Sequence, residues 1–278
     1  MKQLFTAFVE HKEFKRSRPW TVVKQQYSVL TVSTPHYAET VEILLYENAR
    51  GSAYIGGRKF DISGKKVFYV APQTVHSFEY LPSDGKILVV KLQPEMLSEF
   101  LNTERLLSEY GASLASLEVK HENYDDFYPF VKTLEESDSV ASALSSIISI
   151  LYLLACGTPQ KEKSRLSESE EVSENVINEI ITWTEQNYHR PLSLDEVSGR
   201  FGYTKNYFCD MFKSKTGITY LKYLNTLRIS NACNMIKTGI PINRVSHLCG
   251  FETDSYFIQL FKKTIGVTPK QYQIGKTR

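Results

Sequence analysis

Short apolar runs separated by turn residues fill the chain between residues 22 and 92. Runs of this length that are rich in Val, Ile, Tyr and Phe are typical of strands, and their close spacing predicts a small antiparallel sandwich or barrel. Gly56 and Gly57, between two such runs, predict a hairpin turn of the primed type. The predicted strands are 29–32, 41–46, 53–55, 58–62, 67–70, 77–80 and 87–92.

From Pro94 onward the apolar positions recur at helical spacing. We expect helices over 124–134 and 140–155, with a short strand over 114–119 ahead of them. The helix over 140–155 has apolar residues on more than one face, which suits either a place in the domain core or contact with a second subunit.

A polar stretch divides the chain. Residues 157–171 are rich in Lys, Glu and Ser, contain Gly and Pro, and include one apolar residue, Leu166, a composition that predicts a linker. The resulting division is a mainly β domain with following helices over 1–156, the linker, and an all-helical domain over 172–278. The expected fold class is α+β with two domains.

The helical domain contains one sequence pattern twice. The second copy follows the first at an offset of 48 residues up to a glycine and 49 after it. Each copy has a small residue four positions before that glycine, which the turn of a helix-turn-helix requires. We therefore expect two helix-turn-helix units, at about 191–217 and 240–266, joined by a helix over 219–237 of roughly 28 Å. The repeated residues are Ser198, Gly202, Tyr207, Phe208 and Phe212, and then Ser246, Gly250, Tyr256, Phe257 and Phe261.

A helix-turn-helix places its second helix in the major groove of DNA. The core positions of that helix leave one outward face in each unit, and the amides of Asn206 and Gln259 can pair with adenine. The outward residues of the first unit are Lys205, Asn206, Cys209, Asp210 and Lys213, and those of the second are Asp254, Ser255, Ile258, Gln259 and Lys262. The spacer length suits two successive major grooves on one side of a duplex, which are about 34 Å apart.

Composition supports this division of labour. From residue 172 to the end, 14 Lys and Arg stand against 8 Asp and Glu, a net charge of +6, whereas the rest of the chain carries a net charge of −4. A basic C-terminal part is the part expected to meet a polyanion. The four cysteines show no metal-ligand spacing and indicate reduced, mostly buried thiols in a cytoplasmic protein. No apolar run approaches the ~18 residues of a membrane helix, and no secretion signal is expected.

The two predicted helix-turn-helix units and the helix between them resemble the DNA-binding domain of the AraC/XylS transcription regulators. The resemblance covers residues 191–272 and includes Leu194, Val197, Arg228, Ala232 and the segment Thr268-Pro269 besides the repeated residues. It implies a homodimer held by the helices after the barrel, a small-molecule effector, and an activator that works with RNA polymerase. It places base contacts at Asn206, Cys209 and Asp210, and at Asp254, Ser255, Ile258 and Gln259. Family members often have an arginine where this chain has Asp210, and a carboxylate repels phosphate, so the first unit departs from the pattern.

The β region resembles the cupin-like regulatory domain often found upstream in this family. A barrel of this size holds one small ligand, and the residues that we expect to line it are His36, Tyr46, Tyr54, His76 and Phe78. His36, Glu42 and His76 lie where cupin metal ligands fall, but Ala38 replaces one ligand. We therefore expect neither metal nor cofactor, and no catalytic residues. Two alternatives are a ligand-independent DNA-binding protein with a dimerising barrel and a metal-dependent cupin enzyme fused to a DNA-targeting module.

Overall fold

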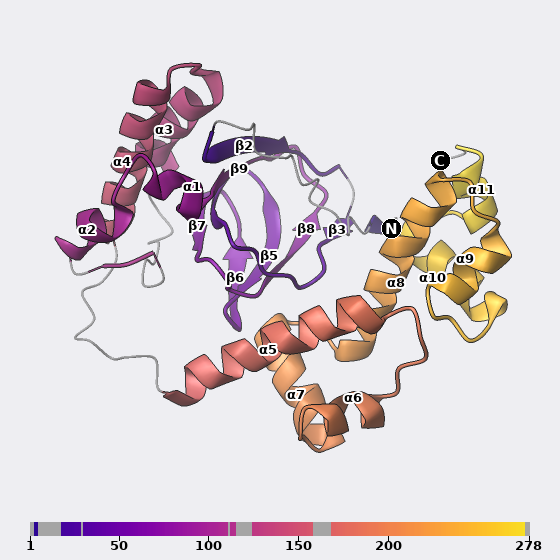
Figure 1. Cartoon of the computed structure of the whole chain (residues 1–278). Helices are drawn as coiled ribbons and strands as arrows, with labels where there is room; N and C mark the ends of the chain where they lie inside the picture. The colour runs from indigo at the N-terminus through magenta and orange to yellow at the C-terminus, as the bar shows by residue number, and fades with distance from the viewer. Residues whose placement is uncertain are drawn as a thin grey trace.

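The computed structural model describes residues 3–4, 18–28, 30–110, 112–114, 124–157 and 168–275. Strands dominate the first half of the chain, helices form the second half, and the two halves lie against each other (Figure 1). The predicted α+β class with a β-rich N-terminal domain and an all-α C-terminal domain is confirmed.

The N-terminal domain contains two β-sheets that face each other. One has the strand order β1-β3-β8-β5-β6 and the other the order β2-β9-β4-β7. Neighbouring strands are antiparallel except β1 and β3. The strands are β1 (Gln3–Leu4), β2 (Trp20–Gln25), β3 (Leu30–Val32), β4 (Val41–Glu47), β5 (Arg50–Ile55), β6 (Arg58–Ile62), β7 (Lys65–Val70), β8 (His76–Leu81) and β9 (Lys86–Leu92).

The space between the sheets is a hydrophobic core. Alternate side chains of a strand point to opposite faces, so each strand sends every second residue inward. In β8, Phe78 and Tyr80 point into this core, whereas Ser77 points to the outer face of the sheet. Gly56 and Gly57 join β5 to β6 with φ values of 55° and 77°, as the predicted primed turn requires.

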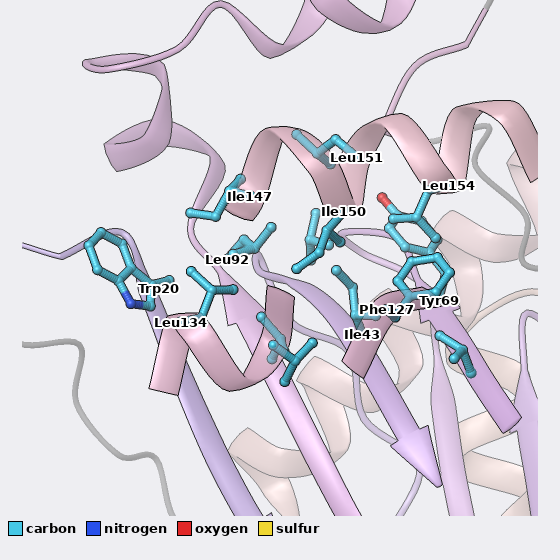
Figure 2. Packing of buried hydrophobic residues seen from close by; sticks show 14 of the residues in the cluster. Trp20, Ile43, Tyr69, Leu92, Phe127, Leu134, Ile147, Ile150, Leu151 and Leu154 are labelled. Carbon is cyan, nitrogen blue, oxygen red and sulfur yellow. The ribbon is translucent and has the colours of Figure 1, made fainter. Parts of the chain in front are cut away.

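Helices cover the outer face of the sheet β2-β9-β4-β7. Ile147, Ile150 and Leu151 are fully buried there in one cluster with Ile43 and Leu92 (Figure 2). Each such side chain contributes roughly 1.5–3 kcal/mol of burial free energy. The helices of this domain are α1 (Pro94–Ser98), α2 (Thr103–Ser108), α3 (Tyr124–Glu136) and α4 (Val140–Gly157).

The C-terminal domain has two helix-turn-helix units on either side of a shared helix. The helices are α5 (Glu168–Asn187), α6 (Leu194–Arg200), α7 (Lys205–Thr216), α8 (Tyr220–Lys237), α9 (Ile242–Leu248), α10 (Asp254–Ile265) and α11 (Pro269–Gln273). Helix α8 is the predicted spacer, and its first half packs in the core of the first unit through Tyr220 and Leu224. Its second half packs in the core of the second unit through Ala232 and Ile236. The two units are therefore built on one continuous helix.

The outer face of the sheet β1-β3-β8-β5-β6 contacts the C-terminal domain at the end of α7. The Ser77 hydroxyl donates a hydrogen bond of 3.1 Å to the carbonyl oxygen of Thr216. The ring of Tyr54 lies against Gly217, where an added Cβ would come within 2.4 Å of it. Val75 is buried in the hydrophobic core of the first unit. The β domain thus touches the helix that carries the first outward face.

Several boundaries differ from the predicted ones. Strand β2 was not among the predicted strands, because its polar residues Thr21, Lys24 and Gln25 interrupt the apolar run. The short helix α2 was also missed. The predicted linker 157–171 overlaps α4 at Gly157 and α5 from Glu168, since glutamate is a good helix former. The remaining positions of that linker, 158–167, lie outside the described residues, as does most of the predicted strand 114–119.

Candidate nucleic-acid interface

The first unit is built by α6 and α7. Ser193 caps α6, because its hydroxyl accepts a hydrogen bond of 3.1 Å from the backbone amide of Glu196. The Glu196 side chain forms a 2.6 Å ion pair with Arg190. Gly202 makes the turn with φ +75°, a left-handed conformation that glycine adopts without strain.

Helix α7 presents the outward face that its sequence pattern predicts. Phe208, Met211 and Phe212 are buried in the core of the unit. Lys205, Asn206, Asp210 and Lys213 are exposed, while Cys209 is half-buried. This surface begins at the N-terminal end of α7, the end that meets base edges in a helix-turn-helix.

Helix α10 repeats this arrangement in the second unit. Thr253 caps it by accepting a hydrogen bond of 3.3 Å from the amide of Tyr256, and Phe257 and Phe261 are fully buried. The predicted outward residues are all exposed: Asp254, Ser255, Ile258, Gln259 and Lys262.

Charges on the two faces differ. Lys205 forms a 3.0 Å ion pair with Asp195 of α6, so its ammonium is partly compensated. Asp210 has no ion pair within the described part of the chain. The last turns of both helices carry lysines, which also favour the negative end of a helix dipole: Lys213 and Lys215 in α7, and Lys262 and Lys263 in α10.

Two exposed tyrosines extend these faces beyond the residues that we predicted. Tyr207 is 57% exposed and Tyr256 is 49% exposed, at corresponding positions of the two copies. The Tyr256 hydroxyl accepts a hydrogen bond of 3.1 Å from the Asn225 side chain of α8. The signal was present in the repeat: the following phenylalanine takes the core position, and one helical step of about 100° turns the tyrosine outward.

The predicted ligand-binding residues of the β domain separate into two groups. Tyr46 and Phe78 lie in the core between the sheets, and the rings of His36 and His76 lie near them with centroids 4.3 Å apart. Tyr54 lies on the outer face of its sheet, against the C-terminal domain. The structure therefore brings four of the five residues toward the interior.

Glu42, one of the three residues at cupin metal positions, forms a buried ion pair with Lys91. Lys91 donates to Glu42 at 2.7 Å, and the Nε2 atom of His76 lies 3.6 Å from the other oxygen of that carboxylate. Burial raises the pKa of Glu42, but the neighbouring His76 ring and the Lys91 ammonium outweigh it and hold this pKa well below its ordinary value. Burial lowers the pKa of His36 to about 4. Glu42 is the one carboxylate among His36, Glu42 and His76, and the Lys91 ammonium already pairs with it. A divalent cation beside that ammonium does not fit this set.

The cysteines differ partly from the expectation. Cys249 is buried, and burial raises the pKa of its thiol to about 12, so it is a weakly reactive core residue. Cys156, at the end of α4, is exposed rather than buried. All four cysteines are free thiols. No helix in the described ranges combines the length and apolar character that crossing a membrane requires.

Comparison with known proteins identifies relatives of the C-terminal domain and of nearly the whole chain. The helix-turn-helix domain family matches residues 197–274. The HTH-type transcriptional activator RhaS of Escherichia coli O1:K1 is 23% identical over 248 residues, which cover 87% of each chain. RhaS of Escherichia fergusonii is 22% identical over 244 residues, with the same coverage of both chains.

Solved structures of similar proteins include one complex with DNA. ToxT from Vibrio cholerae is 13% identical with a TM-score of 0.45, and the match covers 92% of this chain and 98% of that one. The DNA-binding domain of AdpA in complex with a target DNA is 23% identical with a TM-score of 0.35, over 36% of this chain and 90% of that one. The two helix-turn-helix units on one spacer helix, together with similarity to transcriptional activators along most of its length, show that this chain is a DNA-binding transcription regulator whose C-terminal domain is similar to that of the AraC/XylS regulators.

Proposed function

We propose that the chain is an effector-responsive activator that binds two successive major grooves of an operator as a homodimer in the cytoplasm. DNA binding is supported mainly by one observation. Helices α7 and α10 each have an exposed face, and both units pack on the single helix α8. Similarity to transcriptional activators over 87% of the chain supports activation, for which RNA polymerase is the partner.

The residues of each face divide by chemistry. Amide and hydroxyl groups near the start of each helix read base edges, and lysines further along contact phosphate. Ser255 and Gln259 make the second face well suited to bases, whereas Cys209 and Asp210 in the first face offer little to a base other than cytosine. We therefore assign more of the sequence discrimination to the second unit.

Gln259→Ala should relax base preference at one operator position by about 1–3 kcal/mol, because it removes a side chain that reads a base edge. Lys262→Ala, three residues on, is the matched comparison. It should weaken binding to all sequences alike and lower the salt slope by about one unit, since it removes one phosphate contact. Fluorescence anisotropy with selected and single-base-substituted duplexes at several salt concentrations measures both. Equal losses on every sequence for the two variants would contradict this orientation of α10.

The effector site lies between the two sheets in this proposal. His36, Tyr46, His76 and Phe78 offer rings and polar atoms on the inner side. Strand β8 connects that interior to the DNA-binding domain, because the residue between His76 and Phe78 is Ser77, which bonds to Thr216 at the end of α7. An effector acts only through different affinities for two conformations. Thermal melting of the full chain against a metabolite panel tests this: a ligand at 100 times its Kd adds about 2.7 kcal/mol, and no shift across the panel would contradict it.

Helix α4 supplies the dimer contact in this proposal. Its 18 residues contain no charged side chain, and one face already packs on the sheet. The opposite face exposes Ile148 and Tyr152, one helical turn apart. An uncharged face of this kind is complementary to a copy of itself, as a twofold interface requires.

Ile148→Asp should convert the dimer into a monomer, because two carboxylates would meet near the twofold axis without compensating charge. Sedimentation equilibrium of the full chain at micromolar concentration gives the mass. Leu81→Asp is the matched control: Leu81 is also an exposed apolar residue, at 43% exposed, but it ends β8, which belongs to the other sheet from the one that α4 covers. Dissociation by both variants, or by neither, would count against the α4 interface.

A further inference from the structure

Arg228 lies in the middle of α8, at the boundary between the two helix-turn-helix units. The residues before it, such as Leu224, belong to the hydrophobic core of the first unit, and the residues after it, such as Ala232, belong to that of the second. Arg228 itself is 8% exposed. A charged side chain at this depth requires partners that replace water.

The guanidinium of Arg228 has partners on both sides of that boundary. Its Nε donates to the carbonyl oxygen of Tyr188 and its Nη2 donates to that of Arg190, both at 2.9 Å. These carbonyls belong to the turn between α5 and the first unit. On the other side the guanidinium lies over the ring of Phe251, 5.7 Å from its centroid, directly after the turn glycine of the second unit.

No carboxylate forms an ion pair with Arg228 among the described residues. Burial lowers the pKa of Arg228, yet a guanidinium stays protonated in proteins. Its charge is met by carbonyls that follow the C-terminal end of α5, where the helix dipole is negative, and by an aromatic face. These partners satisfy the charge only when the turn at 188–190, α8 and the second unit are all in place.

The second unit also rests directly on that turn. A Cβ added to Gly250 would lie 2.4 Å from the carbonyl oxygen of Tyr188 and 3.0 Å from Nη2 of Arg228. The backbone of the second unit's turn is therefore as close to the 188–190 turn as a glycine permits. Two independent features, the Arg228 guanidinium and this close approach, therefore fix the second unit against the 188–190 turn. We call this contact the joint between the two units.

We propose that Arg228 is a positioning residue that fixes the second helix-turn-helix unit relative to the first. One chain then accepts only one spacing between the two half-sites on DNA that its two units bind. The physical consequence follows from duplex geometry. One inserted base pair moves a half-site by about 3.4 Å and rotates it by roughly 35° about the DNA axis. A rigid joint cannot follow both changes, whereas a loose joint can follow part of them.

The test uses the full chain and DNA selected by it from a random duplex library. Three duplexes are compared: the selected site, the same site with one base pair inserted between its halves, and a site with the second half scrambled. For the wild-type chain the insertion should lower affinity about as far as scrambling does. Arg228→Met, which keeps an apolar stem but removes the guanidinium, should bind the selected site about 10- to 100-fold more weakly. It should bind the scrambled site within about 3-fold of wild type and should lose most of its sensitivity to the insertion.

Controls separate positioning from stability. Ser230→Ala changes an equally buried residue of α8, 8% exposed, and should leave the spacing profile unchanged. Arg228→Lys keeps the charge over Phe251 but not the fork of two donors, and should fall between wild type and Arg228→Met. If Arg228→Met does not fold, Arg228→Lys and Phe251→Leu carry the same comparison. A uniform loss of affinity on all three duplexes, or an unchanged spacing profile, would overturn the proposal. Failure of the wild-type chain to select any sequence would instead contradict the DNA-reading roles proposed for α7 and α10.

Discussion

Gly250→Ala is expected to displace the second helix-turn-helix unit and to destabilise the C-terminal domain by at least about 3 kcal/mol. Gly250 has φ +78°, and alanine in a left-handed conformation costs roughly 1–2 kcal/mol by itself. The added Cβ would also lie 2.4 Å from the carbonyl oxygen of Tyr188. That oxygen is held by its hydrogen bond from Arg228, so relief of the clash requires the joint to open.

Gly202→Ala is the matched control, because Gly202 has the same place in the first unit. Its φ is +75°, but no described heavy atom lies within 4 Å of an added Cβ. Only the conformational cost of roughly 1–2 kcal/mol applies there. Chemical denaturation followed by circular dichroism, together with affinity for the selected duplex, compares the two variants. Equal losses would show that contact with the 188–190 turn contributes nothing to the joint.

Local signals account for the parts of the structure that were predicted. The turn glycines, the small residues Ser198 and Ser246 and the aromatic pairs define each helix-turn-helix within about 25 residues, so no long-range contact is needed to recognise it. The core position of Phe208 fixed the outward side of α7 for the same reason. Most residues of the exposed faces could therefore be named before their surroundings were known, although Tyr207 and Tyr256 were missed and Cys209 is half-buried.

Long-range pairings account for the parts that were not. Tyr54 and Ser77 point outward from a sheet, and nothing in a strand's own residues tells whether water or another domain covers that face. The partnership of Glu42 with Lys91 depends on the register of β4 against β9, in which these two residues are directly opposite. Arg228 reaches carbonyls about 40 residues earlier in the chain. Each of these contacts decides how the domains or units are held together.

The buried ion pair between Glu42 and Lys91 changes the interpretation of the β domain. In a cupin metal site, the cation would supply the positive charge beside two histidines and a carboxylate. Here the Lys91 ammonium, on the neighbouring strand β9, supplies that charge. The Lys91 side chain is 12% exposed and that of Glu42 is 3% exposed, so the pair is largely shielded from solvent. Its stability therefore depends on both partners being present.

Lys91→Met is expected to destabilise the β domain by about 3–5 kcal/mol at neutral pH, because it leaves the Glu42 carboxylate buried without its ammonium. The double variant Lys91→Met, Glu42→Gln should recover most of that loss, since it buries a neutral amide that can donate toward Nε2 of His76, a buried atom with no hydrogen-bond partner among the described residues. Urea unfolding monitored by Trp20 fluorescence, in a Trp183→Phe background, reports on this domain alone, because the chain has two tryptophans. A double variant no more stable than Lys91→Met would contradict the charge argument.

The pH dependence provides a second and independent check on the same pair. In the wild-type chain the pKa of Glu42 is held below its ordinary value. Its contribution to stability is therefore present above the unfolded pKa of about 4.3 and is lost as the pH falls through the folded pKa. Without Lys91, burial is opposed less strongly and the pKa of Glu42 rises, so protonation relieves the variant at a higher pH. The deficit of Lys91→Met relative to wild type should thus be largest at pH 7 and shrink toward pH 4. A deficit that is constant over this range would mean that lost packing, rather than the unpaired carboxylate, causes the instability.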